Sequence, residues 1–142
     1  MRTTLAALLL MSACSGSDTA PSPPADSMQP LTLTCPQAGA EAKLTFTREE
    51  SCSNDGGVEF CLPDQPDARA AIAAISSAIR CSPGGGRAQC SATPGLLLCS
   101  LPTAFPDQCL TSHGAMNDAT WSVTCAAAAR PEVTQIVPSL AE

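Results

Sequence analysis

The chain has 142 residues and a formal net charge of −6, and it contains nine cysteines but only four aromatic side chains. The acidic balance excludes nucleic acid as a partner, because that binding requires clustered Lys and Arg to neutralise phosphates. With so few large rings the core can bury little area, so we expect disulfides to supplement its stability by about 2–4 kcal/mol each.

The start of the chain has the pattern of an export signal. Its parts are a basic start, an apolar core and two small residues before a cysteine, namely Arg2, Leu5–Met11, Ser12, Ala13 and Cys14. This pattern resembles the lipobox signal of bacterial lipoproteins, although Met11 stands where that family most often has leucine. The resemblance implies cleavage before Cys14 and attachment of lipid to its thiol. We therefore predict a lipoprotein signal peptide over residues 1–13 and lipidation of Cys14.

Two other interpretations of this segment fit less well. A signal peptide cut after Ala13 would favour a small residue at position 11, where the chain has Met11. A spanning helix would need about 20 apolar residues, far more than the segment contains. Ser15, directly after the cysteine, resembles the pattern of lipoproteins forwarded to the outer membrane. The predicted location is therefore the cell envelope, with the protein attached to the outer membrane through its lipid.

Composition divides the rest of the chain into three parts. Residues 14–30 are rich in Ser, Pro, Ala and Asp, which is typical of a flexible spacer between the lipidated cysteine and a folded part. Residues 31–126 have the length and patterning of one disulfide-stapled domain. The tail, residues 127–142, contains both apolar side chains and two prolines. It is compatible with a short strand, a docked turn or a loose end.

Eight cysteines lie downstream of Cys14, and an even set in an exported domain predicts disulfides. They are Cys35, Cys52, Cys61, Cys81, Cys90, Cys99, Cys109 and Cys125. The spacing Cys-Ser-x3-Gly-x3-Cys recurs three times, starting at positions 52, 81 and 90. Because turn residues occupy the middle of each unit, we predict β-hairpins with a cysteine at each shoulder. This favours the pairs Cys52–Cys61 and Cys90–Cys99, with the other four sharing two longer bridges.

Hydrophobic periodicity predicts strands and one helix. Apolar and polar residues alternate over 31–35, 42–47 and 119–125, which indicates antiparallel strands with one solvated face. Residues 65–80 instead carry apolar side chains at intervals of three and four, which predicts a helix. Asp64 or Asp67 suits the start of this helix and Arg80 suits its end. The predicted fold is a small, disulfide-rich, mostly β domain of the α+β class, with an antiparallel sheet, hairpins and one packed helix.

The single histidine invites a hydrolytic hypothesis. His113 lies beside Ser112, with Asp107 and Asp118 nearby, and these residue types make up a Ser-His-Asp triad. Adjacent Ser and His side chains rarely point at each other, and the chain has no Gly-x-Ser-x-Gly nucleophile elbow. We therefore predict that the protein is not an enzyme.

The sequence predicts neither a metal site nor a cofactor. In an oxidising compartment disulfide formation outcompetes thiolate coordination of a metal, and no Cys-x2-Cys pair is present. An acidic cluster offers oxygen ligands for Ca²⁺, but the EF-hand position for its last glutamate falls on Leu62; the cluster is Glu49, Glu50, Asn54, Asp55 and Glu59. The run Gly84–Gly86 lacks the Lys-Ser/Thr that completes a phosphate loop, so we predict a tight turn.

These observations favour a structural or interaction module of the cell envelope. The membrane is its partner through the lipid, and an envelope protein or glycan would meet its loops. One alternative is an inhibitor of a secreted or foreign hydrolase, which would insert the segment 102–108 or the loop 111–118, both next to Cys109. The other is a small hydrolytic enzyme centred on His113.

Overall fold

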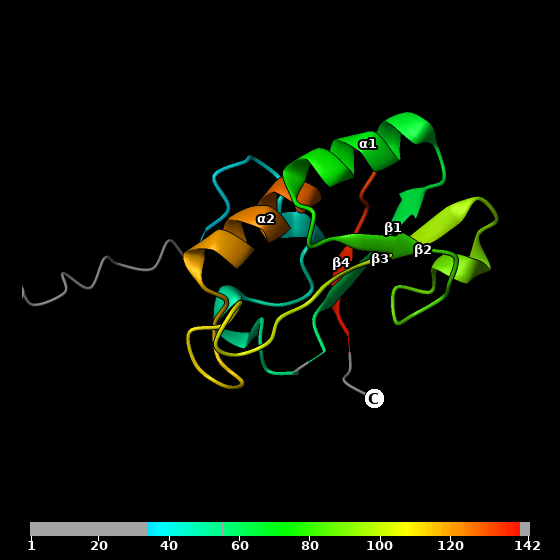
Figure 1. Cartoon of the computed structure of the whole chain (residues 1–142). Helices are drawn as coiled ribbons and strands as arrows, with labels where there is room; N and C mark the ends of the chain where they lie inside the picture. The colour runs from blue at the N-terminus through cyan, green and yellow to red at the C-terminus, as the bar shows by residue number, and fades with distance from the viewer. Residues whose placement is uncertain (1–33, 55, 140–142) are drawn as a thin grey trace, which may run out of the picture.

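The computed structural model describes residues 34–54 and 56–139. The predicted signal peptide 1–13, the lipidation site Cys14, the spacer and Asp55 lie outside the described residues. Three 3-10 turns, two α-helices and four strands follow one another in the order η1, η2, β1, α1, β2, η3, β3, α2 and β4. Figure 1 shows their arrangement.

A four-stranded antiparallel sheet forms the centre of the domain, with the strand order β2-β3-β1-β4. Strand β1 (Val58–Pro63) pairs with β3 (Leu96–Leu101) along its whole length. The edge strands are β2 (Arg80–Ser82), beside β3, and β4 (Ile136–Pro138), beside β1. The sheet confirms the predicted α+β class and antiparallel pairing. Strand β4 lies within the tail 127–142, so this tail contains a short strand.

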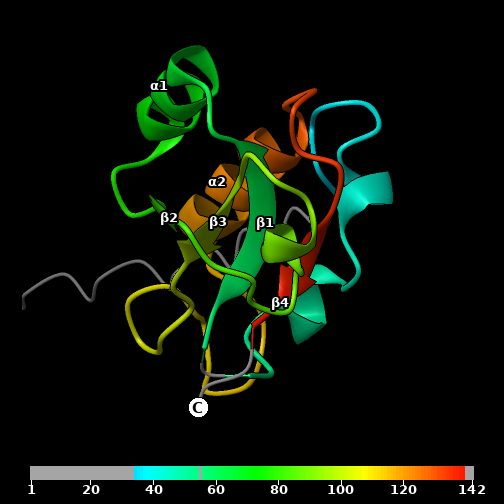
Figure 2. The same cartoon turned by 90° about the vertical axis from the view of Figure 1, so that its right-hand side faces the viewer.

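The two faces of the sheet are covered by different parts of the chain. Buried residues alternate along β1 and β3, and the register sets them opposite one another as Val58 and Leu101, Phe60 and Cys99, and Leu62 and Leu97. This face joins one core cluster with side chains of both helices. In Figure 2 helix α2 lies behind the sheet and the turn η3 lies in front of it.

The segment that covers the second face is fixed by a carboxylate and a disulfide. The side chain of Glu59 accepts a hydrogen bond from the backbone N–H of Arg87 at 2.7 Å, and Cys61 is bonded to Cys90 in η3 (Cys90–Ala92). Gly86 directly precedes the first of these anchors and has a φ of +52°. A Cβ at this position would come within 2.8 Å of the Leu98 side chain, so another residue would strain the backbone and displace Leu98.

The predicted helix is confirmed, but it is shorter than the sequence suggests. Helix α1 (Pro66–Ile75) begins with proline in its first turn and ends five residues before Arg80. Its N-terminal cap position is Gln65, which makes no side-chain capping bond, and Asp67 lies in the first turn. The chain turns extended at Ser76 because Arg80 pairs with β3 as the first residue of β2.

The strand predicted over 119–125 is wrong, because these residues belong to helix α2 (Asp118–Ala128). The side chain of Asn117 accepts a hydrogen bond from the N–H of Thr120 at 2.9 Å, which caps the first turn. Residues 120, 121, 124, 125, 127 and 128 are buried, which is helical spacing. Because the threonines are buried, the apolar pattern over these seven residues fits the helical spacing as well as the strand spacing. The N-cap at Asn117 and the run of alanines at the end of the segment favour the helix.

The strand predicted over 42–47 is also wrong. Two 3-10 turns, η1 (Glu41–Lys43) and η2 (Arg48–Glu50), occupy this region. Between them only Leu44 forms a single bridge to β4, at Ile136. The motif that starts η2 is a capping box, in which Thr47 and Glu50 satisfy each other's backbone N–H groups. Thr34 and Cys35, the described end of the strand predicted over 31–35, lie outside any strand.

All eight downstream cysteines are paired, but the predicted pairs Cys52–Cys61 and Cys90–Cys99 are wrong. The bonds join Cys35 to Cys125, Cys52 to Cys109, Cys61 to Cys90 and Cys81 to Cys99. None of the three Cys-Ser-x3-Gly-x3-Cys units forms a closed hairpin, because each contains a 3-10 turn or loop beside at most one strand. Gly57, in the first unit, instead lets two backbone segments lie close together, because a Cβ on it would be 2.4 Å from the Leu101 carbonyl oxygen.

Non-reducing peptide mapping of the full chain should recover these four linkages. Replacing a cysteine pair by alanines should cost more stability for the Cys35–Cys125 bond, which spans 90 residues, than for Cys81–Cys99, which spans 18. Loop-closure entropy predicts a difference of about 1–1.5 kcal/mol in the free energy of unfolding. Recovery of Cys52–Cys61 or Cys90–Cys99, or equal losses from the two replacements, would contradict the observed pairing.

Candidate functional site

Three of the four residues of the hydrolytic hypothesis, His113, Asp118 and Asp107, contact other parts of the fold. The Nδ1 atom of His113 lies 3.4 Å from the carbonyl oxygen of Ser53, and the residue has a φ of 60°. The Asp118 carboxylate binds Arg48, and the backbone carbonyl of Asp107 accepts a hydrogen bond from the Asn117 side chain at 2.7 Å. These contacts connect loops and helix ends, as structural interactions do.

Members of the predicted acidic cluster likewise make separate structural contacts. Glu50 closes the capping box of η2, while Glu59 binds the backbone of the segment in front of the sheet. Asp55, which the cluster also included, lies outside the described residues. Within residues 34–54 and 56–139, no group of three or more His, Cys, Asp or Glu residues is placed to hold a metal ion.

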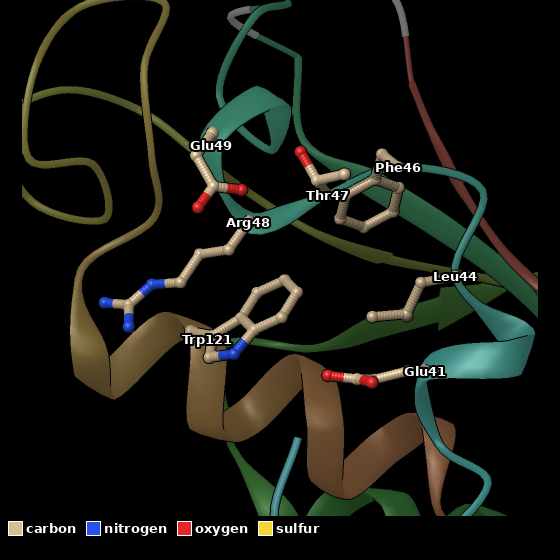
Figure 3. A pocket seen from close by; sticks show the side chains of 7 residues that line it. All are labelled: Glu41, Leu44, Phe46, Thr47, Arg48, Glu49 and Trp121. Atoms are coloured by element: carbon tan, nitrogen blue, oxygen red, sulfur yellow. The ribbon is translucent and has the colours of Figure 1, made fainter. Parts of the chain in front are cut away.

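A groove opens between the two 3-10 turns and helix α2, and Figure 3 shows it from close by. It has a volume of about 400 Å³, within the range of small-molecule and side-chain binding sites. We name it the Trp121 groove and define it by its lining residues, which are Glu41, Leu44, Phe46, Thr47, Arg48, Glu49 and Trp121. Its walls therefore come from η1, η2 and the segment between them, and its base comes from α2.

One buried arginine holds the groove together. Arg48 is 1% exposed, and its Nε and Nη2 atoms both donate to the carbonyl oxygen of Met116 at 3.1 Å. Its Nη2 atom also donates to the carboxylate of Asp118 in the first turn of α2. The neighbouring Ser51 accepts a hydrogen bond from the N–H of Met116 at 2.8 Å. These bonds fix η2 against the start of α2 and thereby fix the width of the groove.

Trp121 carries an unsatisfied polar atom at the base of the groove. The residue is 4% exposed, and its Nε1–H finds no hydrogen-bond acceptor among the described residues. In Figure 3 the six-membered ring is turned toward Phe46, and the nitrogen lies on the opposite edge. A buried N–H without an acceptor costs about 1–3 kcal/mol, so it calls for a physical explanation.

A second hollow is also lined by Trp121. It has a volume of about 250 Å³ and shares Trp121 and Arg48 with the groove. Its other walls are Thr34, Pro36, Asp118 and Ser122. The two hollows therefore adjoin at Trp121 and Arg48.

Sequence reasoning did not identify this site, although two signals were present. The capping-box pattern Thr47-x-x-Glu50 marks a helical turn, which argues against a strand over 42–47. Asn117 followed by Asp118, and by the alanines 126–129, similarly marks a helix over Trp121. Together they would have placed a lone tryptophan on a helix, but the pairing of that helix with η2 through Arg48 depends on the tertiary fold.

Comparisons with protein-family models, with curated proteins and with solved structures found no match. No helix in the described part of the chain has the length and apolar character to cross a membrane. Four disulfides indicate an oxidising, extracytoplasmic location. The function must therefore be inferred from the geometry of the groove and the exposed loops.

The substitution Trp121→Phe tests whether the indole N–H is unpaired in the protein. Because no described residue accepts a hydrogen bond from it, removal should change the free energy of unfolding by less than about 1.5 kcal/mol. Trp121→Ala is the control and should cost about 3–5 kcal/mol through the cavity that it creates. Chemical denaturation measures both. Equal losses would show that Nε1 makes a stabilising hydrogen bond in the free protein.

Proposed function

We propose that this protein is a lipid-anchored binding module of the cell envelope, which takes its ligand in the Trp121 groove. The observation that carries the proposal is the groove itself, which combines an aromatic and aliphatic lining with a donor that no described residue pairs. Binding sites typically join an apolar lining with a few convergent polar groups. A ligand oxygen that accepts from Trp121 would remove the cost of the unpaired N–H.

The number of cysteines supports the proposed lipid anchor at Cys14. Eight cysteines are used in four disulfides, which leaves Cys14 as the one outside them, at the end of the lipobox-like segment. Several acyl chains on one residue hold a protein on a membrane far more firmly than the marginal binding of a single myristoyl chain. Intact-mass analysis of the membrane-extracted protein tests this part, and an unmodified Cys14 would contradict it.

A preformed site binds with little loss of conformational entropy, and the groove has the required supports. The Cys35–Cys125 bond ties the chain before η1 to α2, four residues from Trp121. Arg48 ties η2 to the other end of the same helix. Both walls are therefore fixed to the element that carries the base, so the groove is present before a ligand arrives.

Fluorescence of Trp121 tests the proposal, because it is the only tryptophan in the chain. The purified full chain is titrated with a peptidoglycan disaccharide, a stem peptide, neutral oligosaccharides and short peptides. We expect a saturable change with one of these classes, and Phe46→Ala should weaken that binding at least about fivefold. Phe105→Ala is the matched control, since Phe105 is exposed on a separate loop.

Two results would contradict this function. One is unchanged emission with every compound of the panel at millimolar concentration. The other is equal weakening by Phe105→Ala and Phe46→Ala, which would move the binding site away from the groove. Circular dichroism of both variants ensures that the comparison is made on folded protein.

A second function, inhibition of a hydrolase, is favoured by a separate observation. Phe105 is 55% exposed and Leu110 is 45% exposed, on either side of the disulfide-bonded Cys109. The Gln108 N–H donates to the Ala104 carbonyl at 2.8 Å, which closes the loop that presents Phe105. Rigid loops with exposed apolar side chains suit insertion into a partner's pocket. Titration against proteases and lysozymes tests this function, and no inhibition of any of them would end it.

The third hypothesis, a hydrolytic enzyme centred on His113, stays a prediction without a supporting contact. Its first test is His113→Ala in an assay that shows hydrolysis by the unaltered protein. Unchanged activity in that variant would exclude His113 as the catalytic base.

A further inference from the structure

We propose that the ligand of the Trp121 groove is a positively charged protein segment, which inserts a Lys or Arg side chain between Glu41 and Glu49. This inference rests on the proposed function and specifies its ligand. Glu41 and Glu49 lie at opposite corners of the groove in Figure 3, with Trp121 and Phe46 between them. The arrangement offers negative charge at both ends and an apolar base in the middle.

The two carboxylates remain available for a ligand. One oxygen of Glu41, Oε1, accepts the N–H of Cys35 at 2.8 Å, and the side chain is otherwise unengaged by the described residues. Glu49 makes no hydrogen bond or ion pair through its side chain to any residue in 34–54 or 56–139. Both residues are exposed. They can therefore pair with a cation at little desolvation cost.

The one positive charge in the lining does not neutralise them. The side chain of Arg48 is 0% exposed, and its guanidinium binds Met116 and Asp118. In Figure 3 this side chain extends away from Leu44 and Glu41. The groove consequently presents an acidic rim to a ligand, and the protein as a whole carries a net charge of −6. Charge of this sign attracts cationic ligands and repels anionic ones.

The apolar walls of the groove suit the remaining parts of such a side chain. Lys and Arg carry long apolar stems that pack on hydrophobic surface while the charged head seeks a polar group. Leu44 and the half-buried ring of Phe46 provide that surface, and an aromatic face also attracts a cation. A peptide backbone contributes carbonyl oxygens, and no described residue supplies an acceptor to the Trp121 N–H.

A neutral glycan would use fewer of these features. Sugar hydroxyls can hydrogen-bond a carboxylate and a ring can stack on Phe46, but a neutral ligand gains nothing from the negative potential of the rim. Charge complementarity therefore favours the protein segment, and a glycan becomes an outcome of the test.

The probes are two peptides that differ in one charge. Acetyl-Ala-Ala-Arg-Ala-Ala-amide is titrated into the full chain and followed by Trp121 fluorescence, beside the same peptide with neutral citrulline in place of arginine. We expect the arginine peptide to bind about tenfold more tightly, because citrulline loses the attraction of the acidic rim and the cation–π contact. Its affinity should also fall as salt rises, because exposed charges are screened.

Conservative variants assign the effect to the rim. Glu41→Gln and Glu49→Gln should each weaken the arginine peptide by about two- to fivefold and leave the citrulline peptide unchanged. Glutamine at position 41 retains an oxygen that can accept the Cys35 N–H, so the wall should stay in place. The matched control is Asp67→Asn, which removes an exposed carboxylate from the first turn of α1, outside the groove.

The outcomes distinguish failure of the cationic-ligand inference from failure of the proposed binding function. Equal binding of both peptides, or equal weakening by Asp67→Asn, overturns the cationic ligand. Binding of a neutral oligosaccharide without binding of the arginine peptide also overturns it, while the groove remains a binding site. If no compound of either experiment changes the emission of Trp121, the proposed function fails as well.

Discussion

The buried guanidinium of Arg48 is the contact on which the rest of the site depends. It bonds the carbonyl of Met116 and the carboxylate of Asp118, and so joins a 3-10 turn near the start of the domain to a helix near its end. Removing one partner of such a contact is costly, because a charge or carbonyl is then left unpaired in the interior. A smaller or uncharged residue at position 48 would free η2, and with it one wall of the groove.

The disulfides complete this architecture by attaching irregular segments to regular ones. Cys35–Cys125 ties the first described residues to α2, and Cys61–Cys90 ties the η3 segment across the sheet. Cys81–Cys99 joins residues that are directly opposite in β2 and β3. A core with four aromatic residues therefore does not need to hold long loops by packing alone.

The sequence was sufficient for the fold class and for helix α1, because a stripe at intervals of three and four has one structural meaning over ten residues. It misled at α2 and at 42–47, where short alternation fitted both a strand and a helix and where capping residues decided the outcome. The predicted disulfide pairs were wrong because the partners are set by the tertiary fold. Cys61 bonds a residue of the segment folded over the sheet, and Cys99 bonds a residue of the edge strand β2, and local spacing carries no information about either.

The groove was beyond sequence reasoning for a related cause. Its walls come from residues 41–49 and its base is Trp121, and they meet only because Arg48 reaches Met116 and Asp118. The composition shows that the chain is acidic and has one tryptophan and few other aromatics, but it does not show where these side chains meet. Two features connect the fold to the proposed binding: a buried charge that organises the backbone, and a buried N–H that no described residue pairs.

The most direct measurement is the ¹H–¹⁵N spectrum of the purified full chain, in which the single tryptophan gives one indole cross-peak. The account predicts an upfield indole proton, as expected without an acceptor, which exchanges slowly with solvent because Trp121 is 4% exposed. On titration with the arginine peptide the cross-peak should move downfield as a carbonyl oxygen accepts the N–H. A downfield cross-peak in the free protein that no ligand shifts would contradict the account, because the indole would then already be satisfied.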